Sequence, residues 1–258
     1  MPKLPNLARI VVVNVPPFLI TKSRMSSPLQ SGEGSANTTM VITWFGQACF
    51  KIEGEKTTIV TDPFGDDFGL KLSRLTADIV TVSHGHADHN NVAAVKPTGE
   101  RALYIADTPG EFEVQGAFLY GIPSFHDSAQ GAERGSNIIF RIELDGISIG
   151  HLGDLGHPLE SAQLERLEGV DILMIPVGGV FTINGKQATE AVSQIEPRLV
   201  IPMHYQLPAL KLSGGKKLDG LDPFCNEIGI CPKEILPKLK ITKKDLPQDN
   251  LQVVLLEA

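Results

Sequence analysis

Short apolar runs separated by turn residues recur along most of this chain, from about residue 41 to its end. Three of these runs follow one another closely, with Gly46 and Gly54 as turn residues, and predict an opening β-meander at 41–45, 49–53 and 57–61. Later runs of the same kind predict strands at 78–83, 102–106, 118–122, 137–144, 147–150, 171–176, 199–202 and 251–256.

Two segments in the second half carry helical spacing instead. The apolar residues of 159–167 fit that spacing in part, and the full i, i+3, i+4, i+7 pattern is met by Ala188, Ala191, Val192 and Ile195. A meander followed by strands that alternate with helices predicts layered sheets with helices on the outside.

The first 39 residues differ from the rest in composition. Four basic residues precede the first acidic one, and 26–39 is rich in Ser, Gly, Asn and Thr. We expect 1–39 to be a mobile extension and 40–258 to be the folded domain; a transit peptide and a true start at Met40 both stay open. The apolar run at 10–20 is broken by Asn14 and two prolines, and it is too short to span a bilayer.

Composition places the chain among ordinary globular proteins. It has 258 residues, of which 42% are hydrophobic and 21% charged, and its formal net charge is −7. That charge argues against a broad surface for nucleic acid or anionic membrane. The three cysteines, Cys49, Cys225 and Cys231, are odd in number and lack C-x-x-C spacing, so no disulfide framework is expected and a reducing, cytoplasmic compartment fits.

One hexapeptide carries the strongest chemical signal: His84-Gly85-His86-Ala87-Asp88-His89. A shuffled chain of this composition would contain the pattern H-x-H-x-D-H only about 3 times in 10,000. The predicted strand at 78–83 delivers it to a strand end, and residues two apart in an extended segment point to one side. His84 and His86 can therefore converge on one metal ion, while Asp88 and His89 present ligands to a neighbouring ion.

Three later residues also stand at predicted strand ends or turns. His126 lies in a turn-rich segment, Asp154 follows the strand at 147–150, and His204 follows the strand at 199–202. All seven histidines lie between 84 and 204, which agrees with a single metal centre. Imidazoles with an occasional carboxylate suit zinc best, and manganese or iron are the alternatives.

The ordered ligands and several short motifs resemble the metallo-β-lactamase superfamily over residues 40–205. The motifs are Thr43-Trp44-Phe45-Gly46-Gln47-Ala48-Cys49-Phe50, Thr61-Asp62-Pro63-Phe64, His151-Leu152-Gly153-Asp154, Pro176-Val177-Gly178-Gly179 and Pro202-Met203-His204-Tyr205. Within the superfamily they look like the branch of metal-dependent hydrolases related to L-ascorbate-6-phosphate lactonase and N-acylphosphatidylethanolamine phospholipase D. The resemblance implies an α/β fold, a four-layer αββα sandwich of two mixed sheets with helices on the outer faces and metals at one rim.

The resemblance also implies an assignment of ligands to two ions. The first ion would be held by His84, His86 and His126, and the second by Asp88, His89 and His204, with Asp154 bridging the two. His151 is a rival to His126, although a strand that presents Asp154 to the metals should turn a residue three positions earlier to the opposite face.

For several neighbouring residues the sequence leaves the role open. Asp62 either fixes the ring of a ligating histidine or is a plain Asp-Pro turn. The lysine-rich stretch 206–249 matches no ligand motif and receives no function. Residues flanking the predicted rim, without an assigned role, are Asp127, Arg134, Asn137, His157, Thr182 and Tyr205.

These features predict a hydrolase with two divalent ions that attacks a small ester, lactone or phosphodiester with metal-bound hydroxide. Asp88 would orient that hydroxide, and the leaving-group proton would come from His151, Tyr205 or metal-bound water. The alternatives are a nuclease of the same superfamily, which the charge of −7 disfavours, a non-catalytic metal-binding or sensor protein, and an iron-dependent redox protein. Partners beyond a small-molecule substrate and the oligomeric state are not indicated.

Overall fold

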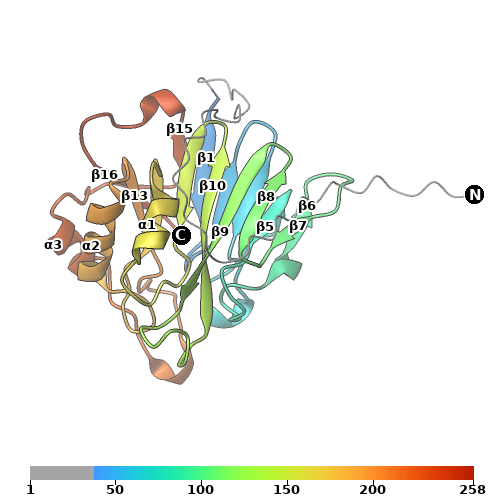
Figure 1. The fold of residues 1–258 in the computed structure, drawn as a ribbon. Helices are drawn as coiled ribbons and strands as arrows, with labels where there is room; N and C mark the ends of the chain where they lie inside the picture. Colours follow the sequence, from blue (N-terminus) through green and yellow to red (C-terminus); the bar gives the residue numbers. More distant parts are fainter. Residues whose placement is uncertain (1–37) are drawn as a thin grey trace, which may run out of the picture.

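The structure is a computed structural model, and it describes residues 38–258 (Figure 1). The expected extension at 1–39 and the apolar run at 10–20 therefore lie outside the described residues, apart from Thr38 and Thr39. The division of the chain into an extension and a domain stays a prediction. Within 38–258, no helix is long and apolar enough to cross a membrane.

The first sheet starts as the predicted meander and ends with parallel strands. Its order is β15-β1-β2-β3-β5-β7, antiparallel from β15 to β3 and parallel from β3 to β7. The strands are β1 (Met40–Trp44), β2 (Phe50–Glu53), β3 (Thr58–Thr61), β5 (Ile79–Thr81), β7 (Tyr104–Ala106) and β15 (Leu239–Ile241).

The second sheet repeats this plan with longer strands. Its order is β16-β13-β12-β11-β10-β9-β8, parallel from β16 to β11 and antiparallel from β11 to β8. The strands are β8 (Gly110–Val114), β9 (Ala117–Phe125), β10 (Ser136–Leu144), β11 (Ile147–His151), β12 (Ile172–Pro176), β13 (Leu199–Met203) and β16 (Gln252–Val253).

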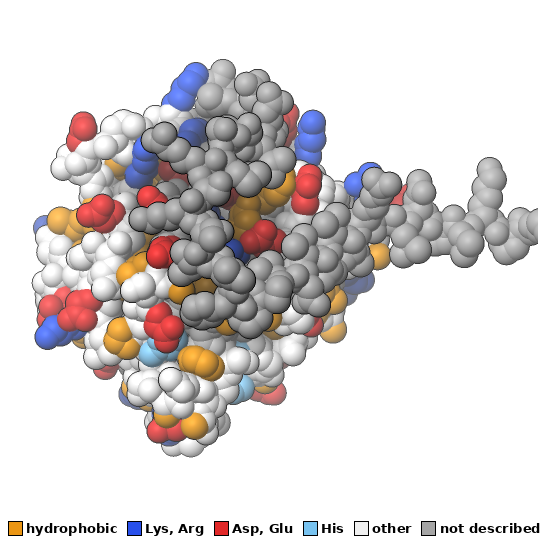
Figure 2. Space-filling view, in the orientation of Figure 1, with side chains coloured by type: hydrophobic (Ala, Val, Ile, Leu, Met, Phe, Trp, Pro, Cys, Tyr) orange, Lys and Arg blue, Asp and Glu red, His pale blue; other side chains and the backbone are white. Residues whose placement is uncertain are grey.

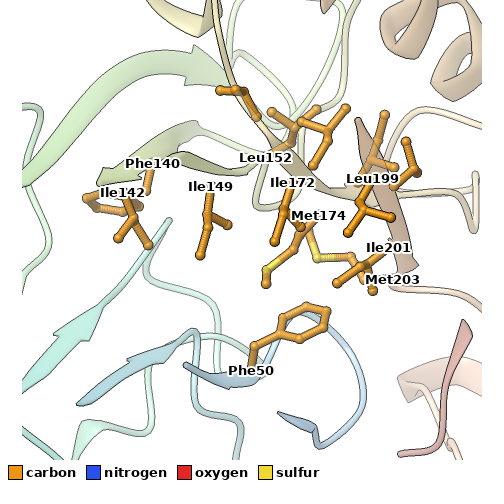
Figure 3. Close-up of a cluster of buried hydrophobic side chains, with 14 of the residues drawn as sticks. Phe50, Phe140, Ile142, Ile149, Leu152, Ile172, Met174, Leu199, Ile201 and Met203 are labelled. Carbon is orange, nitrogen blue, oxygen red and sulfur yellow. The ribbon is translucent and has the colours of Figure 1, made fainter. Parts of the chain in front are cut away.

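The main hydrophobic core lies between the two sheets, as Figure 3 shows for part of it. Phe50 of β2 points from the first sheet toward Met174 and Met203 of the second. The central strands β12 and β13 are buried along their whole length, as expected of parallel strands covered on both faces.

Three short α-helices cover the second sheet, grouped on one side of the molecule in Figure 1. They are α1 (Ser161–Leu167), α2 (Gly185–Ile195) and α3 (Asp222–Ile228). α1 and α2 follow the β11 and β12 strands as crossovers between parallel neighbours. The predicted α/β fold with two packed mixed sheets is confirmed, and the second sheet has the predicted outer layer of helices.

On the first sheet the outer layer is thinner than in the predicted sandwich. A second cluster of buried residues, including Val60, Phe64 and Val80, lies on the face of that sheet opposite the main core. In the described part of the chain this layer consists of 3₁₀ turns and a two-stranded ladder: η1 (Asp66–Phe68), η2 (Val92–Ala94), β4 (Leu75–Ala77) and β6 (Val95–Pro97). The remaining short elements are η3 (Ser213–Gly215), η4 (Lys243–Asp245), β14 (Ile235–Leu236) and β17 (Leu255–Leu256).

The predicted strands and both helices are present, with bounds shifted by a few residues, but six strands and helices of the described residues were not predicted from the sequence: β4, β6, β8, β14, β15 and α3. β8 alternates exposed glutamates, Glu111 and Glu113, with half-buried residues at the sheet edge, so it lacks an apolar run. α3 has seven residues, too few for a periodic signal. The predicted strand at 251–256 is divided between β16 and β17, which pair in different sheets.

The expectation that the cysteines are unpaired is wrong for two of them. Cys225 and Cys231 form a disulfide, whereas Cys49 is a buried free thiol. α3 ends at Gly229, which has a left-handed φ of 73°, and the reversal brings the two cysteine Cα atoms to 5.2 Å. A sequence pattern does not reveal such a turn, so the spacing of the cysteines did not predict this disulfide.

Candidate metal centre

The predicted ligands all follow strands that end at one edge of the sandwich. Because β5 is parallel to β3 in one sheet, and β9, β11 and β13 run in one direction in the other, their carboxyl ends meet there. β5 leads into the hexapeptide, β9 into His126, β11 into Asp154 and β13 into His204. Two backbone hydrogen bonds tie the sheets together at this edge, Ile138 N–H to Ser83 O and His204 N–H to Gln47 O.

The seven side chains form two adjoining groups. Each group has ligand atoms that lie within 4.8 Å of one another: His84, His86 and His126 in the first, and Asp88, His89, Asp154 and His204 in the second. His86 is exposed and Asp88 is half-buried, whereas the other five are buried. His86 and Asp88 therefore mark the solvent side of the centre.

One carboxylate oxygen lies between the two groups. Asp154 Oδ2 is 3.1 Å from His126 Nε2 and 4.0 Å from His84 Nε2 in the first group. It is also 3.2 Å from His89 Nε2 and 3.3 Å from His204 Nε2. Ligands about 2.0–2.1 Å from a tetrahedral ion are about 3.3 Å apart, so these separations suit two ions that share Asp154.

Unsatisfied buried atoms support a fit to metal ions. Among residues 38–258, His89 Nε2 and Asp154 Oδ1 are buried without a hydrogen-bond partner. Buried polar groups normally have partners, so unpaired atoms on two of the candidate ligands are compatible with a bound ion. Imidazole nitrogens and carboxylate oxygens together are a donor set that zinc accepts.

Asp62 orients histidines of both groups through its two oxygens. Its Oδ2 accepts from His89 Nδ1 at 2.9 Å and from Ser83 Oγ at 2.5 Å, and its Oδ1 accepts from Ser83 N at 2.7 Å. Because the Ser83 hydroxyl donates to Asp62, its oxygen accepts from His84 Nδ1 at 3.0 Å. Both imidazoles therefore turn Nδ1 toward these acceptors and Nε2 toward the centre. Of the two readings of Asp62, the structure supports the first.

The pKa shifts in the centre follow from burial and from mutual charge. Burial, reinforced by the charge of His89, lowers the pKa of His84 to about 3, so His84 is a neutral imidazole at physiological pH. Burial opposes ionisation of Asp154, but His204 and His89 outweigh it and lower the pKa of that carboxyl well below its usual range. Burial likewise disfavours the protonated form of His89, yet Asp154 and Asp88 raise its pKa well above the ordinary value. The two carboxylates thus favour a positive charge at His89. Without a metal, this charge is that of the protonated imidazole.

His151 does not face the centre. Its Nε2 donates to the Ala48 carbonyl at 2.9 Å, its ring packs edge-on against Phe50, and it is fully buried. β11 therefore places His151 and Asp154 on different sides, as the strand argument requires. His126, not His151, lies with His84 and His86. His157 is likewise engaged, with Nδ1 donating to Pro158 O and Nε2 accepting from Phe125 N.

Asn137 and Gly153 hold Asp154 in place. The Asn137 amide donates to Ser124 Oγ and to Leu152 O, and its Oδ1 accepts from Asp154 N at 2.9 Å. Gly153 has a left-handed φ of 54°, and a Cβ there would lie 2.6 Å from the Cβ of Ser83. Only glycine suits that position.

Gln47 is a site residue to which the sequence gave no role beyond its motif. It is fully buried, and its Nε2 lies 3.2 Å from Asp88 Oδ2 and 3.3 Å from His204 Nε2. Its carbonyl accepts from the Trp44 indole and from His204 N. Gln47, Asp62 and His204 all have positive φ values, which is backbone strain typical of functional sites. The only sequence signal was the Gly46-Gln47 turn between two predicted strands.

The other rim residues take different positions. The Asp127 carboxylate accepts four backbone N–H groups of its own loop, and Thr182 donates to Ile183 O. Tyr205 is buried against Trp44, and burial raises its pKa to about 12. The lobe after β13, brown at the lower end of Figure 1, lies directly below histidine side chains that reach the surface in Figure 2.

The fold and this edge define a metallo-β-lactamase-type metalloprotein, and comparison with known proteins agrees. The family described as beta-lactamase superfamily domain matches residues 41–204. The chain belongs to this family. A UPF0173 metal-dependent hydrolase of Methanoculleus marisnigri is 33% identical over 192 residues, covering 67% of this chain and 84% of that protein. A relative of the same description from Thermococcus onnurineus is 33% identical over 188 residues, covering 64% of this chain and 84% of the relative.

Solved structures show the same fold. A Thermotoga maritima protein of the metallo-β-lactamase superfamily, described as a candidate zinc-dependent hydrolase, has 36% identity and a TM-score of 0.65, covering 84% of this chain and 98% of that chain. A metallohydrolase from Ignicoccus hospitalis, at 21% identity and a TM-score of 0.58, covers 85% of this chain and 96% of its own and supports the fold alone.

Proposed function

We propose that this metal-dependent hydrolase binds two divalent ions, zinc in the first instance, and cleaves a small ester, lactone or phosphodiester. The observation that carries the proposal is the position of Asp154 Oδ2, within 3.1–4.0 Å of imidazole nitrogens from both groups. We assign His84, His86 and His126 to the first ion and Asp88, His89 and His204 to the second, with Asp154 shared. The description of the Thermotoga maritima relative as a candidate zinc-dependent hydrolase supports the choice of metal.

The chemistry of bound zinc suits this reaction class. When bound, two such ions would lower the pKa of a water at the centre to about 7 and would polarise a carbonyl or phosphoryl oxygen. The protein contributes orientation: Asp62 and Ser83 fix the rings of His89 and His84, so that their Nε2 atoms face the centre.

Asp88 is the side chain we assign to the attacking water. Burial opposes its ionisation, but the charge of His89 and hydrogen bonds with His204 and His89 lower its pKa, so it is a carboxylate. The Gln47 amide donates to one carboxylate oxygen of Asp88. The Asp88 side chain is 19% exposed to solvent. Asp88 can therefore accept a hydrogen bond from water on the open side of the centre and hold that water in place.

The leaving-group proton does not come from His151, because its Nε2–H donates to a backbone carbonyl. Of the side chains considered for this role, Tyr205 remains. Its pKa of about 12 keeps the phenol protonated at neutral pH but makes it a weak acid. We therefore assign this step to water at the centre in preference to Tyr205.

Metal analysis and a substrate panel test the proposal together. We expect close to two ions per chain after reconstitution with zinc, measured by elemental analysis, and hydrolysis of at least one of 4-nitrophenyl acetate, bis(4-nitrophenyl) phosphate and a homoserine lactone. A chelator should abolish turnover, and zinc should restore it. Fewer than one ion per chain would refute the centre. Two ions with no turnover on the panel would favour a non-catalytic metal-binding protein.

A further inference from the structure

Two loops beside the candidate centre are each fixed to one of its histidines. The loop 127–135 begins after His126 and returns to it, because His126 N–H donates to Gly135 O at 3.0 Å. The Asp127 carboxylate accepts backbone N–H groups from the turn, including that of Arg134 at 2.7 Å. These hydrogen bonds fix the backbone of Arg134 beside that of His126.

The second loop, 178–182, packs against His204. A Cβ on Gly178 would lie 2.1 Å from the His204 carbonyl oxygen, so the two backbones touch. The next residues have left-handed φ values, 57° at Gly179 and 59° at Val180. A β-branched residue with positive φ is strained, and Val180 is 50% exposed. Strain and an exposed apolar side chain together, beside the centre, suggest that this loop contacts a ligand.

Two cations meet at the aromatic ring of the second loop. The Arg134 guanidinium reaches across, with Nη2 3.5 Å from Val180 O and Cζ 5.7 Å from the centroid of the Phe181 ring. Lys216 Nζ lies 5.0 Å from the same centroid. Lys216 belongs to the lysine-rich stretch that the sequence left without a function.

The charges at this point are only partly compensated. Arg134 Nη1 lies 3.6 Å from Glu133 Oε2, whose side chain is 66% exposed, so this surface pair contributes little. The Asp219 carboxylate lies against Gly179. Among residues 38–258, Lys216 forms no ion pair. An incoming anion would therefore find two cations and an aromatic face already in place.

The subsite is close enough to the centre for a small molecule. Phe181 is three residues from Gly178, which contacts His204, so their Cα atoms are at most about 11 Å apart. Arg134 is adjacent to Gly135, the hydrogen-bond partner of His126. One small substrate can thus place its scissile bond at the centre and another group at the ring.

We propose that Arg134, Phe181 and Lys216 form a substrate subsite that binds an anionic group attached to an apolar portion, so that the preferred substrate is a small ester carrying a phosphate or carboxylate. The proposal rests on the proposed hydrolase function for its kinetic test. The binding test below does not require turnover.

The kinetic test compares two esters that differ mainly in charge: mono-4-nitrophenyl glutarate and neutral 4-nitrophenyl butyrate. Arg134→Ala and Lys216→Ala should each lower kcat/KM for the anionic ester about five- to tenfold, mainly through KM, and change the neutral ester less than twofold. Phe181→Leu keeps apolar volume but removes the ring face, and should lower the preference for the anionic ester, whereas Phe181→Tyr should retain it. Lys96→Ala, an exposed lysine on β6 far from the rim, is the control for net charge.

Binding of phenylphosphonate and of benzoate, measured by calorimetry on the zinc-loaded protein, separates this proposal from the hydrolase assignment. Phenylphosphonate affinity should fall five- to tenfold in the Arg134 and Lys216 variants and stay unchanged in Lys96→Ala; a preference for benzoate would identify carboxylate as the anion. If wild type turns over no ester but this pattern of binding holds, the function fails and the subsite stands. Equal affinities for the wild type and the Arg134 and Lys216 variants, with folding verified by circular dichroism, would overturn the subsite.

Discussion

The clearest test of the centre is Asp62→Asn. Asp62 is not itself a candidate metal ligand, and it contacts the candidate ligands only through hydrogen bonds. It accepts from His89 Nδ1 and Ser83 Oγ on one oxygen and from Ser83 N on the other. Asparagine tolerates the left-handed φ of 38° at this position, so the backbone should be preserved. The substitution replaces one acceptor oxygen by an N–H donor.

The magnitude follows from that exchange. If the asparagine oxygen keeps the bond from Ser83 N, its NH₂ faces His89, which must move its proton from Nδ1 to Nε2 to accept. An Nε2–H cannot bind a metal, and loss of such a partner typically costs 10- to 100-fold in affinity, or about 1.4–2.7 kcal/mol. A donor left unpaired in this buried position would lower the free energy of unfolding by about 1–3 kcal/mol.

A matched variant makes the prediction selective. Ser83→Ala leaves the His89–Asp62 bond but removes the acceptor for His84 Nδ1, so it should weaken the first ion by about tenfold and spare the second. Asp62→Asn should weaken the second ion more. Both are measured by zinc titration against a chromophoric chelator, with urea unfolding of the metal-free proteins as a check on folding.

The reasoning would be refuted if Asp62→Asn bound both ions with wild-type affinity. Asp62 would then be only a turn residue before Pro63. Asp171→Asn, a buried carboxylate paired with Lys243 at the opposite end of the sandwich, is the control: it should lower stability without changing metal affinity.

Three further predictions test the ligand assignment. Asp154→Ala should weaken both ions, whereas His89→Ala should mainly weaken the second; equal losses in elemental analysis would remove the shared role of Asp154. His126→Ala should empty the first position and His151→Ala should keep both ions, and the reverse result would exchange their roles. Because burial lowers the pKa of His84 to about 3 while the unfolded imidazole titrates near 6.5, the unfolded chain binds the extra proton between those values. The metal-free protein should therefore lose stability as pH falls from about 6.5 toward 3, and His84→Gln should reduce that loss; identical pH profiles of urea unfolding would contradict this.

The sequence could identify most strands along the chain and the seven candidate ligands, because both are local features. The hexapeptide begins three residues after the end of β5, and His126, Asp154 and His204 each come one to three residues after a strand. A strand followed by a polar turn is recognisable without knowing its neighbours, and parallel strands bring such ends together.

Features that depend on distant contacts were out of reach. Asp62 and His89 are 27 residues apart, and Gln47 and His204 are 157 apart. The Cys225–Cys231 disulfide depends on a left-handed turn at Gly229, and the edge strand β8 on pairing with β9. Local patterns contain no information about such pairings.

The sequence by itself determined the fold class and the chemical types gathered at one edge, since strand periodicity and ligand order are encoded in neighbouring residues. Only the tertiary structure decided that His126 rather than His151 lies with His84 and His86, and that Asp62 and Ser83 orient rings of both groups. It also decided that Arg134 and Lys216 meet at Phe181. The physical reason is that hydrogen bonds and charge contacts act over about 3–6 Å in space, and the packing of two sheets, not sequence separation, sets which groups come that close.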